Sequence, residues 1–388
     1  MLKYWLWLSL LEGITRRKKV SLLKQYSGPD DIFQREDYSD LAELTEAEYR
    51  ALMNKNMLRA EQVYNICRRK NISILTYGDA DYPARLRNIE DPPVVLYYRG
   101  TLPELETVPA VAIVGTRRAT AYGTAAAKEF GKQIAQAGGV VISGGAKGID
   151  SMALQGALAG DGLTVAVLGC GVDITYPANN RQLFDQVRTE GCLLSEYPPG
   201  DEPEQWHFPE RNRIISGLSD SVVVIEAPKR SGALITAGIA LEQGRDVYAV
   251  PGNIDMETCE GSNMLLQNGA AVALSGWDVL KEPATGILPQ EKKSEKKLPA
   301  EKSAPDKKGI DNPANSSYIV TTEGQDSLTP EESSILACLS QTPVAMDEVL
   351  AQLDIPAGVA LKLITGLSLR GLVINHPGKM LSVKRQHK

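Results

Sequence analysis

Short, continuous apolar runs recur through the middle of the chain and alternate with longer segments of helical periodicity. The runs are residues 110–114, 139–143, 164–168, 221–225 and 246–250. Runs of this kind are typical of strands that are buried on both faces, as in a parallel sheet covered by helices. Helical spacing of apolar residues marks the intervening segments 123–136, 148–158, 180–187 and 232–243. The pattern predicts a doubly wound α/β core with its function at the carboxyl edge of the sheet, where glycines follow several strands.

The first part of the chain has helical periodicity instead. Apolar residues at helical spacing mark residues 4–11, 16–25, 45–53 and 56–70, with a turn at Ser27-Gly28-Pro29. We expect residues 1–70 to form a small helical domain of the SAM-like or helix-hairpin-helix-like type. Such compact helix pairs can bind a DNA backbone or a protein, and this one can equally be a packing domain. Residues 71–281 form the α/β domain, entered through predicted strands at 72–75 and 94–98.

The last quarter of the chain divides into two parts of different composition. Residues 282–327 are rich in lysine and small polar residues and have few large apolar ones, which predicts a flexible linker. Residues 328–388 then show three helical segments and a hairpin around Pro377-Gly378, the pattern of a winged helix. The third helix of such a domain reads DNA bases, but here it offers only Lys362, with Arg370 at its end. Protein contact or weak backbone contact is therefore favoured over sequence-specific reading of a duplex.

Composition places the chain among soluble globular proteins. It has 388 residues, of which 43% are hydrophobic and 23% charged, enough for two or three domains. The formal net charge of −6 argues weakly against nucleic acid as a partner, although an acidic protein can still have a local basic groove. No apolar run is long enough to cross a membrane, and residues 4–11 lack the cleavage site of a signal peptide.

The five cysteines give no sign of a metal site or a disulfide framework. They are Cys67, Cys170, Cys192, Cys259 and Cys338. None forms a Cys-x-x-Cys pair or lies near a histidine cluster, so buried reduced thiols are expected. Reduced thiols are typical of the cytosol, and we expect a cytoplasmic protein with no membrane segment and no metal.

The glycine turns do not match the motifs of standard nucleotide cofactors. A dinucleotide site needs Gly-x-Gly-x-x-Gly, but Arg117 and Arg118 stand where the glycines of that motif would be. A P-loop needs Gly-Lys followed by Ser or Thr, and the turn after the second run, Gly144 to Asp150, has the wrong spacing and no such hydroxyl. No cofactor is therefore expected.

An anion site built from amides and cations remains. The amides of Gly115, Thr116, Gly144 and Gly145 are predicted to point at a phosphate at the edge of the sheet. The cations that could complete this site are Arg117, Lys147, Arg211 and Arg213. For any one of them, a surface or structural ion pair is the alternative.

A dense stretch of arginines and aromatic residues follows Trp206 and His207. Phe208 precedes Arg211-Asn212-Arg213, and an aromatic ring beside arginines can stack unpaired bases. The alternative is structural, with Phe208 in the core and Arg213 paired with a carboxylate such as Glu226.

Enzymatic chemistry has few candidate groups. Glu226 could grip a ribose or act on a glycosidic bond, because it follows a predicted strand directly. Asp150 and Asp173 stand at strand–helix junctions, where helix capping is the simpler role. The three histidines are far apart in the sequence, and no Ser-His-Asp set or metal set is visible.

Several strings in the core carry a family resemblance. They are residues 113–117 (IVGTR), 143–150 (SGGAKGID), 168–173 (LGCGVD) with Tyr176-Pro177, 208–219 (FPERNRIISGLS), 231–237 (SGALITA) and 250–252 (VPG). In this order they resemble DNA-processing protein A, the DprA/Smf family of bacteria. The resemblance implies an extended Rossmann-like domain that binds single-stranded DNA, helps to load RecA in natural transformation and DNA recombination, and forms homodimers.

The resemblance also assigns roles to particular residues. The family's Gly-Ser/Thr-Arg motif falls on Gly115-Thr116-Arg117, and its basic segment falls on Arg211-Asn212-Arg213. Members often carry lysine after the Tyr-Pro pair, where this chain has Ala178-Asn179-Asn180, so one cationic contact is missing here.

The hypothesis is therefore a non-catalytic, sequence-independent binder of single-stranded DNA. Its phosphates would lie on Arg117, Lys147, Arg211 and Arg213, and its bases near Phe208 or Tyr176. The alternative is a nucleotide-handling hydrolase like the lysine-decarboxylase-like phosphoribohydrolases. Their Pro-Gly-Gly-x-Gly-Thr-x-x-Glu pattern is matched here only by residues 231–238, without the glutamate. A winged-helix transcription factor is a third possibility, disfavoured by the third helix.

Overall fold

The structure is a computed structural model. It describes residues 1–41, 44–280 and most of 329–383, with gaps at 341–343, 354, 356, 371 and 377–379. The chain divides into two compact units, Met1–Glu295 and Lys296–Lys388, which we describe separately. The predicted linker, residues 282–327, lies outside the described residues.

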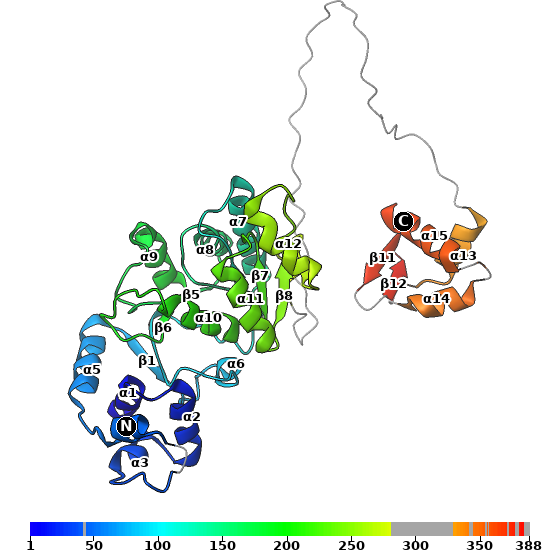
Figure 1. Cartoon of the computed structure of the whole chain (residues 1–388). Helices are drawn as coiled ribbons and strands as arrows, with labels where there is room; N and C mark the ends of the chain where they lie inside the picture. The colour runs from blue at the N-terminus through cyan, green and yellow to red at the C-terminus, as the bar shows by residue number, and fades with distance from the viewer. Residues whose placement is uncertain are drawn as a thin grey trace, which may run out of the picture. The chain divides into compact units, whose positions relative to one another are not determined.

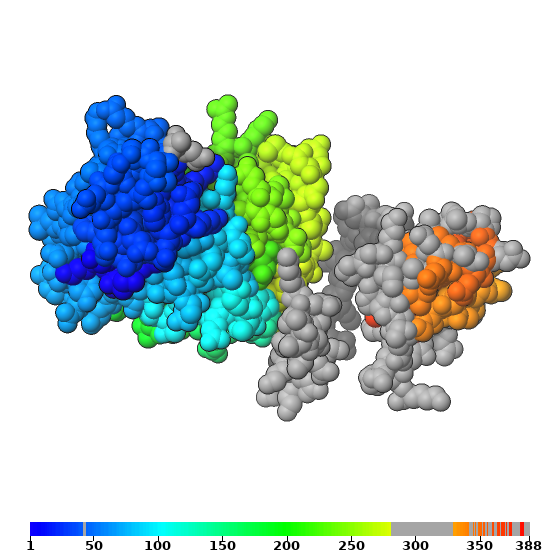
Figure 2. Space-filling view, turned by 90° about the horizontal axis from the view of Figure 1, so that it is seen from below, coloured from blue at the N-terminus to red at the C-terminus, as the bar shows by residue number. Residues whose placement is uncertain are grey.

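Five helices form the N-terminal part of the first unit. They are α1 (Leu2–Leu10), α2 (Arg16–Gln25), α3 (Pro29–Gln34), α4 (Glu46–Met53) and α5 (Leu58–Lys70). Thr15 caps α2, and Thr45 and Glu48 form a capping box on α4, so the local sequence sets both helix starts. Helix α3 was not predicted, because six residues after the Gly28 turn are too few to show a period. In Figure 2 these helices, in blue, form one continuous surface with the core.

A nine-stranded sheet forms the core, in the order β1-β2-β6-β5-β4-β3-β7-β8-β9 (Figure 1). Its strands are β1 (Ser73–Thr76), β2 (Val95–Gly100), β3 (Ala110–Val114), β4 (Val140–Ser143), β5 (Thr164–Leu168), β6 (Cys192–Ser195), β7 (Ser221–Val224), β8 (Asp246–Ala249) and β9 (Ala271–Val272). The seven strands β3 to β9 are parallel, and β2 joins β6 antiparallel. The strand order changes direction between β3 and β7, which is the topological switch point of a doubly wound sheet.

Helices cover both faces of the sheet. On one face lie α10 (His207–Gly217) and α11 (Gly232–Glu242), and on the other lie α7 (Ala121–Gln136), α8 (Ile149–Ala159) and α9 (Arg181–Glu190). Strand β3 shows the alternation, because Ala112 packs in the first apolar cluster and Ile113 in the second. Helices α7 and α8 approach so closely that a Cβ on Gly156 would lie 2.0 Å from the Lys128 carbonyl oxygen. This arrangement confirms the predicted extended Rossmann-like α/β fold.

The second unit has the elements of a winged helix. Helices α13 (Pro330–Ala337), α14 (Met346–Gln352) and α15 (Ala357–Leu369) accompany a small antiparallel sheet of β10 (Val344–Ala345), β12 (Met380–Val383) and β11 (Val373–His376). Thr329 and Glu332 form a capping box, with Pro330 in the first turn of α13. The predicted winged helix is confirmed.

Within the described residues, no helix has the length and apolar character needed to span a membrane.

Candidate nucleic-acid interface

A cavity of about 270 Å³ opens at the carboxyl edge of the sheet, between the loops after β3, β4 and β5 and the start of α10. Its lining residues are Arg117, Arg118, Gly144, Ala146, Lys147, Leu168, Gly169, Cys170, Tyr176, Pro177, Phe208 and Arg211. Three cations in this lining, Arg117, Arg118 and Lys147, are exposed. Over the described residues, no carboxylate forms an ion pair with any of them. Their charge is therefore available to an external anion.

Aromatic rings stand beside these cations. The Arg117 guanidinium lies 5.3 Å from the centroid of the Phe208 ring, in cation–π geometry. The Tyr176 ring lies 5.6 Å from Phe208 at an interplanar angle of 31°, and Tyr176 is 42% exposed. Gly169 leaves room for this arrangement, because a Cβ there would lie 2.9 Å from Phe208 Cδ1. The cavity thus combines free cations with ring faces that a base can stack on.

Arg211 forms the inner wall of the cavity. Only 5% of the residue is exposed, and its Nη1 donates to the Gly144 carbonyl oxygen at 2.9 Å and also to the Val167 carbonyl oxygen. Its Nε donates to Asn212 Oδ1 at 3.3 Å, which places Asn212 as a supporting residue. Burial lowers the pKa of Arg211 to about 10, so the guanidinium remains charged at neutral pH. This cation is a fixed part of the wall, held by two backbone carbonyl groups.

Asp150, in the first turn of α8, supplies a buried anion behind the same wall. Its Oδ2 accepts from the Ala146 amide at 3.3 Å, in the loop before the helix. The predicted capping role is wrong, because α8 begins after Gly148 without a side-chain cap. Burial raises the pKa of Asp150 to about 6, against the opposing effect of Arg211. A Cβ on Gly144 would lie within 2.7 Å of both Asp150 Oδ2 and Arg211 Nη2. Gly144 therefore allows the two charged groups to approach each other.

One of the loop amides, that of Thr116, is used differently from the prediction. The Thr116 amide donates to the Glu226 carbonyl oxygen at 2.7 Å, so the prediction that it points at a phosphate is wrong. Gly115 packs against Ile149, where a Cβ would lie 2.5 Å from Cγ1. Gly145, with φ at +64°, faces the Phe184 ring. These residues shape the loops, and the exposed cations on the same loops face the cavity.

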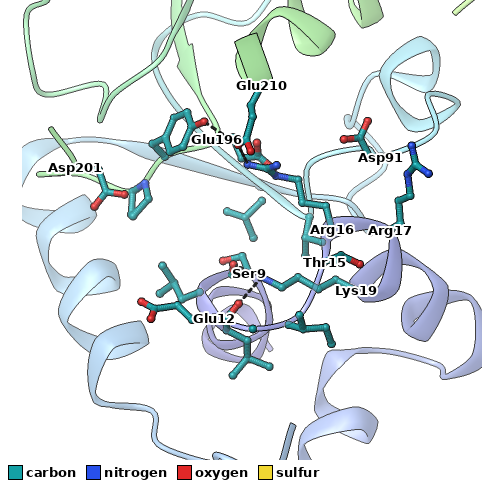
Figure 3. A pocket seen from close by; sticks show the side chains of 18 of the residues that line it. Ser9, Glu12, Thr15, Arg16, Arg17, Lys19, Asp91, Glu196, Asp201 and Glu210 are labelled. Carbon is teal, nitrogen blue, oxygen red and sulfur yellow. Dashed lines mark hydrogen bonds and ion pairs between the residues drawn. The ribbon is translucent and has the colours of Figure 1, made fainter. Parts of the chain in front are cut away.

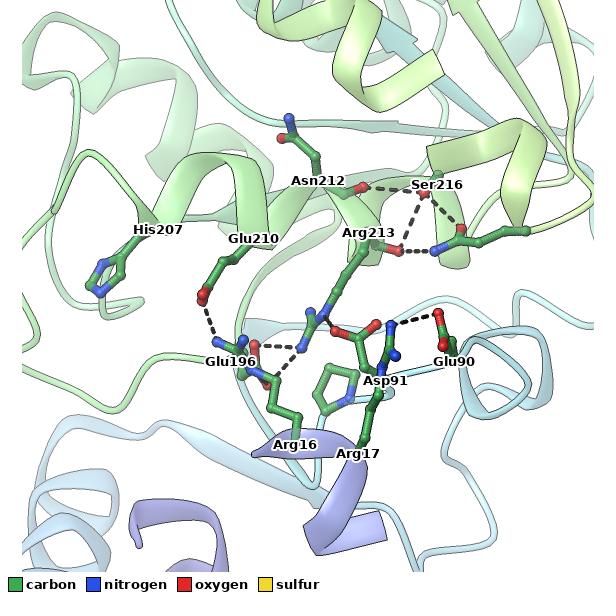
Figure 4. Close-up of polar contacts among 12 residues, drawn as sticks. Arg16, Arg17, Glu90, Asp91, Glu196, His207, Glu210, Asn212, Arg213 and Ser216 are labelled. Atoms are coloured by element: carbon green, nitrogen blue, oxygen red, sulfur yellow. Dashed lines mark hydrogen bonds and ion pairs between the residues drawn. The ribbon is translucent and has the colours of Figure 1, made fainter. Parts of the chain in front are cut away.

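Arg213 does not line the cavity and points from α10 toward Asp91 and Glu196 (Figure 4). Its Nε pairs with Asp91 Oδ2 at 2.9 Å and its Nη2 with Glu196 Oε2 at 2.8 Å. The side chain is 7% exposed. The prediction that Arg213 contacts a phosphate is wrong, since both carboxylates hold it within the protein. Its alternative, a structural ion pair, is correct, although Glu226 is not the partner.

Glu226 occupies the crevice at the topological switch point. The residue is fully buried, and its carboxylate accepts from the Thr120 amide at 2.9 Å and from Thr120 Oγ1 at 2.5 Å. A Cβ on Gly123 would lie 2.2 Å from Glu226 Oε2, so the carboxylate is enclosed on that side too. Where doubly wound sheets commonly bind a ligand, this chain places its own carboxylate. Among the described residues, no group of three or more His, Cys, Asp or Glu could hold a metal ion.

Sequence reasoning did not assign six members of the lining to the site, and two of these, Arg118 and Cys170, have side chains with distinctive chemistry. Arg118 was read only as a residue that breaks a dinucleotide motif, although its place beside Arg117 on a loop was a usable signal. Cys170 gave no signal, because a lone cysteine has many buried roles.

The fold and the cavity together define an extended Rossmann-like protein with a cationic, aromatic-lined carboxyl edge. The chain belongs to the DNA recombination-mediator protein A family, whose family model matches residues 73–284. Residues 321–379 match the DprA winged helix domain. The predicted membership of the DprA/Smf family is thereby confirmed.

Individual relatives agree with this assignment. The chain is 38% identical over 335 residues to Protein Smf of Synechocystis sp., covering 84% of this chain and 83% of the relative. It is 46% identical over 206 residues to DNA processing protein DprA of Streptococcus pneumoniae, covering 53% and 72%. The X-ray structure of DNA processing protein A from Streptococcus pneumoniae has a TM-score of 0.63 and 34% identity, covering 72% of this chain and 97% of that one.

Proposed function

We propose that this protein binds single-stranded DNA without sequence preference at the carboxyl-edge cavity. The observation that carries the proposal is the set of three exposed, unpaired cations beside the Phe208 and Tyr176 rings. Arg117, Arg118 and Lys147 contact phosphates, which suits a ligand of repeated negative charge. A base stacks on Phe208 or Tyr176, and because every base has a ring face, such a site tolerates any sequence.

Duplex DNA fits the cavity less well. Stacking on Phe208 requires a base that is not paired within a helix, and a duplex keeps its base faces covered. The proposal therefore includes a preference for single strands. We propose that the winged helix contacts a protein partner or makes weak contacts with the DNA backbone.

The wider role that we propose is help in loading RecA during recombination and natural transformation. The family description, a recombination mediator, and the DNA processing named in the relatives support this role. We also propose a cytoplasmic homodimer. Exposed apolar Leu241, Val272 and Leu274 lie by the β8–β9 edge of the sheet, where an open strand edge favours association.

A nucleotide-handling hydrolase is the competing function, and the position of Glu226 disfavours it. A catalytic carboxylate must reach its substrate, but Glu226 is buried and hydrogen-bonded to Thr120. The cavity also lies on the β3–β4–β5 side of the switch point, and its lining has no carboxylate. We propose that the protein is not an enzyme. Release of free base from nucleoside monophosphates would contradict this.

The first experiment compares labelled oligo-dT with a duplex of equal length at about 50 and about 200 mM salt. We expect tighter binding to oligo-dT and a steep loss of affinity with salt, because phosphate binding releases counterions. A second oligonucleotide of mixed sequence should bind within a few-fold of oligo-dT. Equal or tighter binding to the duplex would contradict the proposal.

Replacing Phe208 with leucine tests the stacking contact. Leucine keeps apolar bulk against Gly169 but has no ring face, so oligo-dT affinity should fall by about tenfold, within the range for one stacked base. The slope of affinity against salt should stay unchanged, because no phosphate contact is removed. Phe208→Tyr is the matched control and should bind like the wild type. Unchanged affinity of the Phe208→Leu variant would show that Phe208 does not stack on a DNA base.

A further inference from the structure

Helix α10 carries functional groups on two opposite sides. Phe208 and Arg211, three residues apart, line the cavity. Glu210 and Arg213, also three residues apart, point to the other side of the helix and join a network of ion pairs (Figure 4). Because all four residues belong to one helix, a change in the ion pairs of Glu210 and Arg213 that shifts or rotates α10 also moves Phe208 and Arg211.

Arg16, the first residue of α2, reaches this helix from the N-terminal domain. Its Nε donates to Glu196 Oε1 at 3.0 Å, and its Nη2 donates to Glu210 Oε2 at 2.5 Å. The side chain of Arg16 is 28% exposed and that of Glu196 is 13% exposed. Burial opposes the charge of Arg16, but Glu196 and Glu210 outweigh it and raise its pKa above the ordinary value.

Glu196 connects this contact to the core. It is the residue after β6 and accepts from Arg16 and from Arg213, so one carboxylate ties α2 and α10 to the end of that strand. Arg213 is held in addition by Asp91. Two arginines and three carboxylates thus form one continuous network across the domain boundary. The members of such a network are energetically coupled, so the loss of one weakens the contacts of the others.

A cleft of about 730 Å³ lies beside the network, between the N-terminal domain and the core (Figure 3). The loop before α2 borders this cleft, and Lys19 fixes it by donating to the carbonyl oxygens of Ser9 and Leu11 at 2.7 and 2.8 Å. Val95 and Tyr97 pack the N-terminal domain against the core through an apolar cluster. Arg16 forms a separate, polar bridge from this domain to α10.

We propose that Arg16 is a positioning residue for the DNA site. By holding Glu210 and Glu196, it lets the N-terminal helical domain fix the placement of α10, and through it Phe208 and Arg211. The inference rests on the proposed binding of single-stranded DNA at the cavity. It assigns to the N-terminal domain a role in affinity without any contact with DNA.

The test measures oligo-dT binding by Arg16→Ala over a series of salt concentrations, with Arg17→Ala as the matched control. Arg17 is the adjacent arginine, but among the described residues its ion pair is with exposed Glu90, so its loss should leave affinity unchanged. For Arg16→Ala we expect affinity to fall by about threefold to tenfold, typical of a residue that acts through another. The salt slope should match that of the wild type, because no phosphate contact is lost.

Two further variants separate positioning from general destabilisation. Glu210→Gln leaves Arg16 paired with Glu196, and we expect it to lower affinity in the same direction, with little added loss in the double variant. Arg16→Lys restores one of the two contacts and should recover part of the affinity. These measurements are made below the unfolding temperature of each variant.

The outcomes distinguish this inference from the proposed function. Wild-type affinity and slope in Arg16→Ala would overturn the positioning role while leaving the DNA site intact. A reduced slope would show that Arg16 itself contacts DNA, which also overturns it. If the wild type does not bind oligo-dT, the proposed function fails first.

Discussion

Replacing Arg117, Arg118 and Lys147 together with alanine is expected to weaken oligo-dT binding by about a hundredfold at about 0.1 M salt. Each contact between a cation and a single-strand phosphate contributes about 0.7 to the slope of log affinity against log salt. Loss of three contacts should therefore reduce this slope by about 2. The fold should be unaffected, because all three side chains are exposed and none is in an ion pair with a carboxylate of the described residues.

The control for this variant removes the same charge elsewhere. Lys128 and Lys132 on α7 and Arg188 on α9 are exposed and do not line the cavity. Their triple replacement with alanine lowers the net charge equally, so it measures the general effect of charge on binding. We expect it to change affinity by a few-fold at most and to leave the slope nearly unchanged. Equal losses in both triple variants would show that DNA is held by overall charge and not by the cavity.

The sheet could be predicted from the sequence because strands buried on both faces read as continuous apolar runs. Five runs gave β3, β4, β5, β7 and β8. Strand β6, from Cys192 to Ser195, was not among the predicted runs. Its absence hid Glu196 as well, and with it the carboxylate that connects Arg16 to Arg213.

The arginines could be predicted as a group, but their separate roles could not. Arg211 and Arg213 are two residues apart, which reads as one basic segment, yet on α10 they face different sides. Arg211 faces the cavity wall and Arg213 faces the network with Asp91 and Glu196. The phase of a short helix against the sheet depends on packing partners far away in the chain, which local spacing does not reveal.

Glu226 shows the same limit at the switch point. Its position after β7 suggested chemistry, because carboxyl ends of strands are where ligands bind. That its carboxylate would be enclosed by Thr120 and Gly123 depends on how α7 begins beside β7. The glycine at 123 was visible in the sequence, but its partner was not.

Replacing Arg211 with alanine is expected to destabilise the core by about 3–5 kcal/mol, the range for removing one member of a buried charged set. The variant leaves the Gly144 and Val167 carbonyl groups without their donor and Asp150 without its neighbouring cation. Urea-induced unfolding of wild type and variant measures the difference in the free energy of unfolding. Arg117→Ala is the control and should change stability by no more than about 0.5 kcal/mol, because Arg117 is exposed.

The pH dependence of this loss identifies the contribution of Asp150. Burial already raises the pKa of Asp150 from 3.8 to about 6, and removal of Arg211 should raise it further. Where the folded state holds a proton that the unfolded state releases, stability falls as pH rises, until the pH exceeds the folded pKa. Relative to wild type, the variant should therefore lose the least stability near about pH 4, where Asp150 is neutral. It should lose the most above the raised pKa, near about pH 8.

Two results would contradict this account of the cavity wall. A loss below about 1 kcal/mol near about pH 8 would mean that Arg211 is solvated and free to act as a phosphate contact like Arg117. A large loss of stability with no dependence on pH would support the carbonyl contacts of Arg211 but contradict its interaction with Asp150. The expected pattern, a large loss that diminishes as pH falls, requires both contacts, and it assigns Arg211 to the fixed wall against which Arg117, Arg118 and Lys147 present their charge.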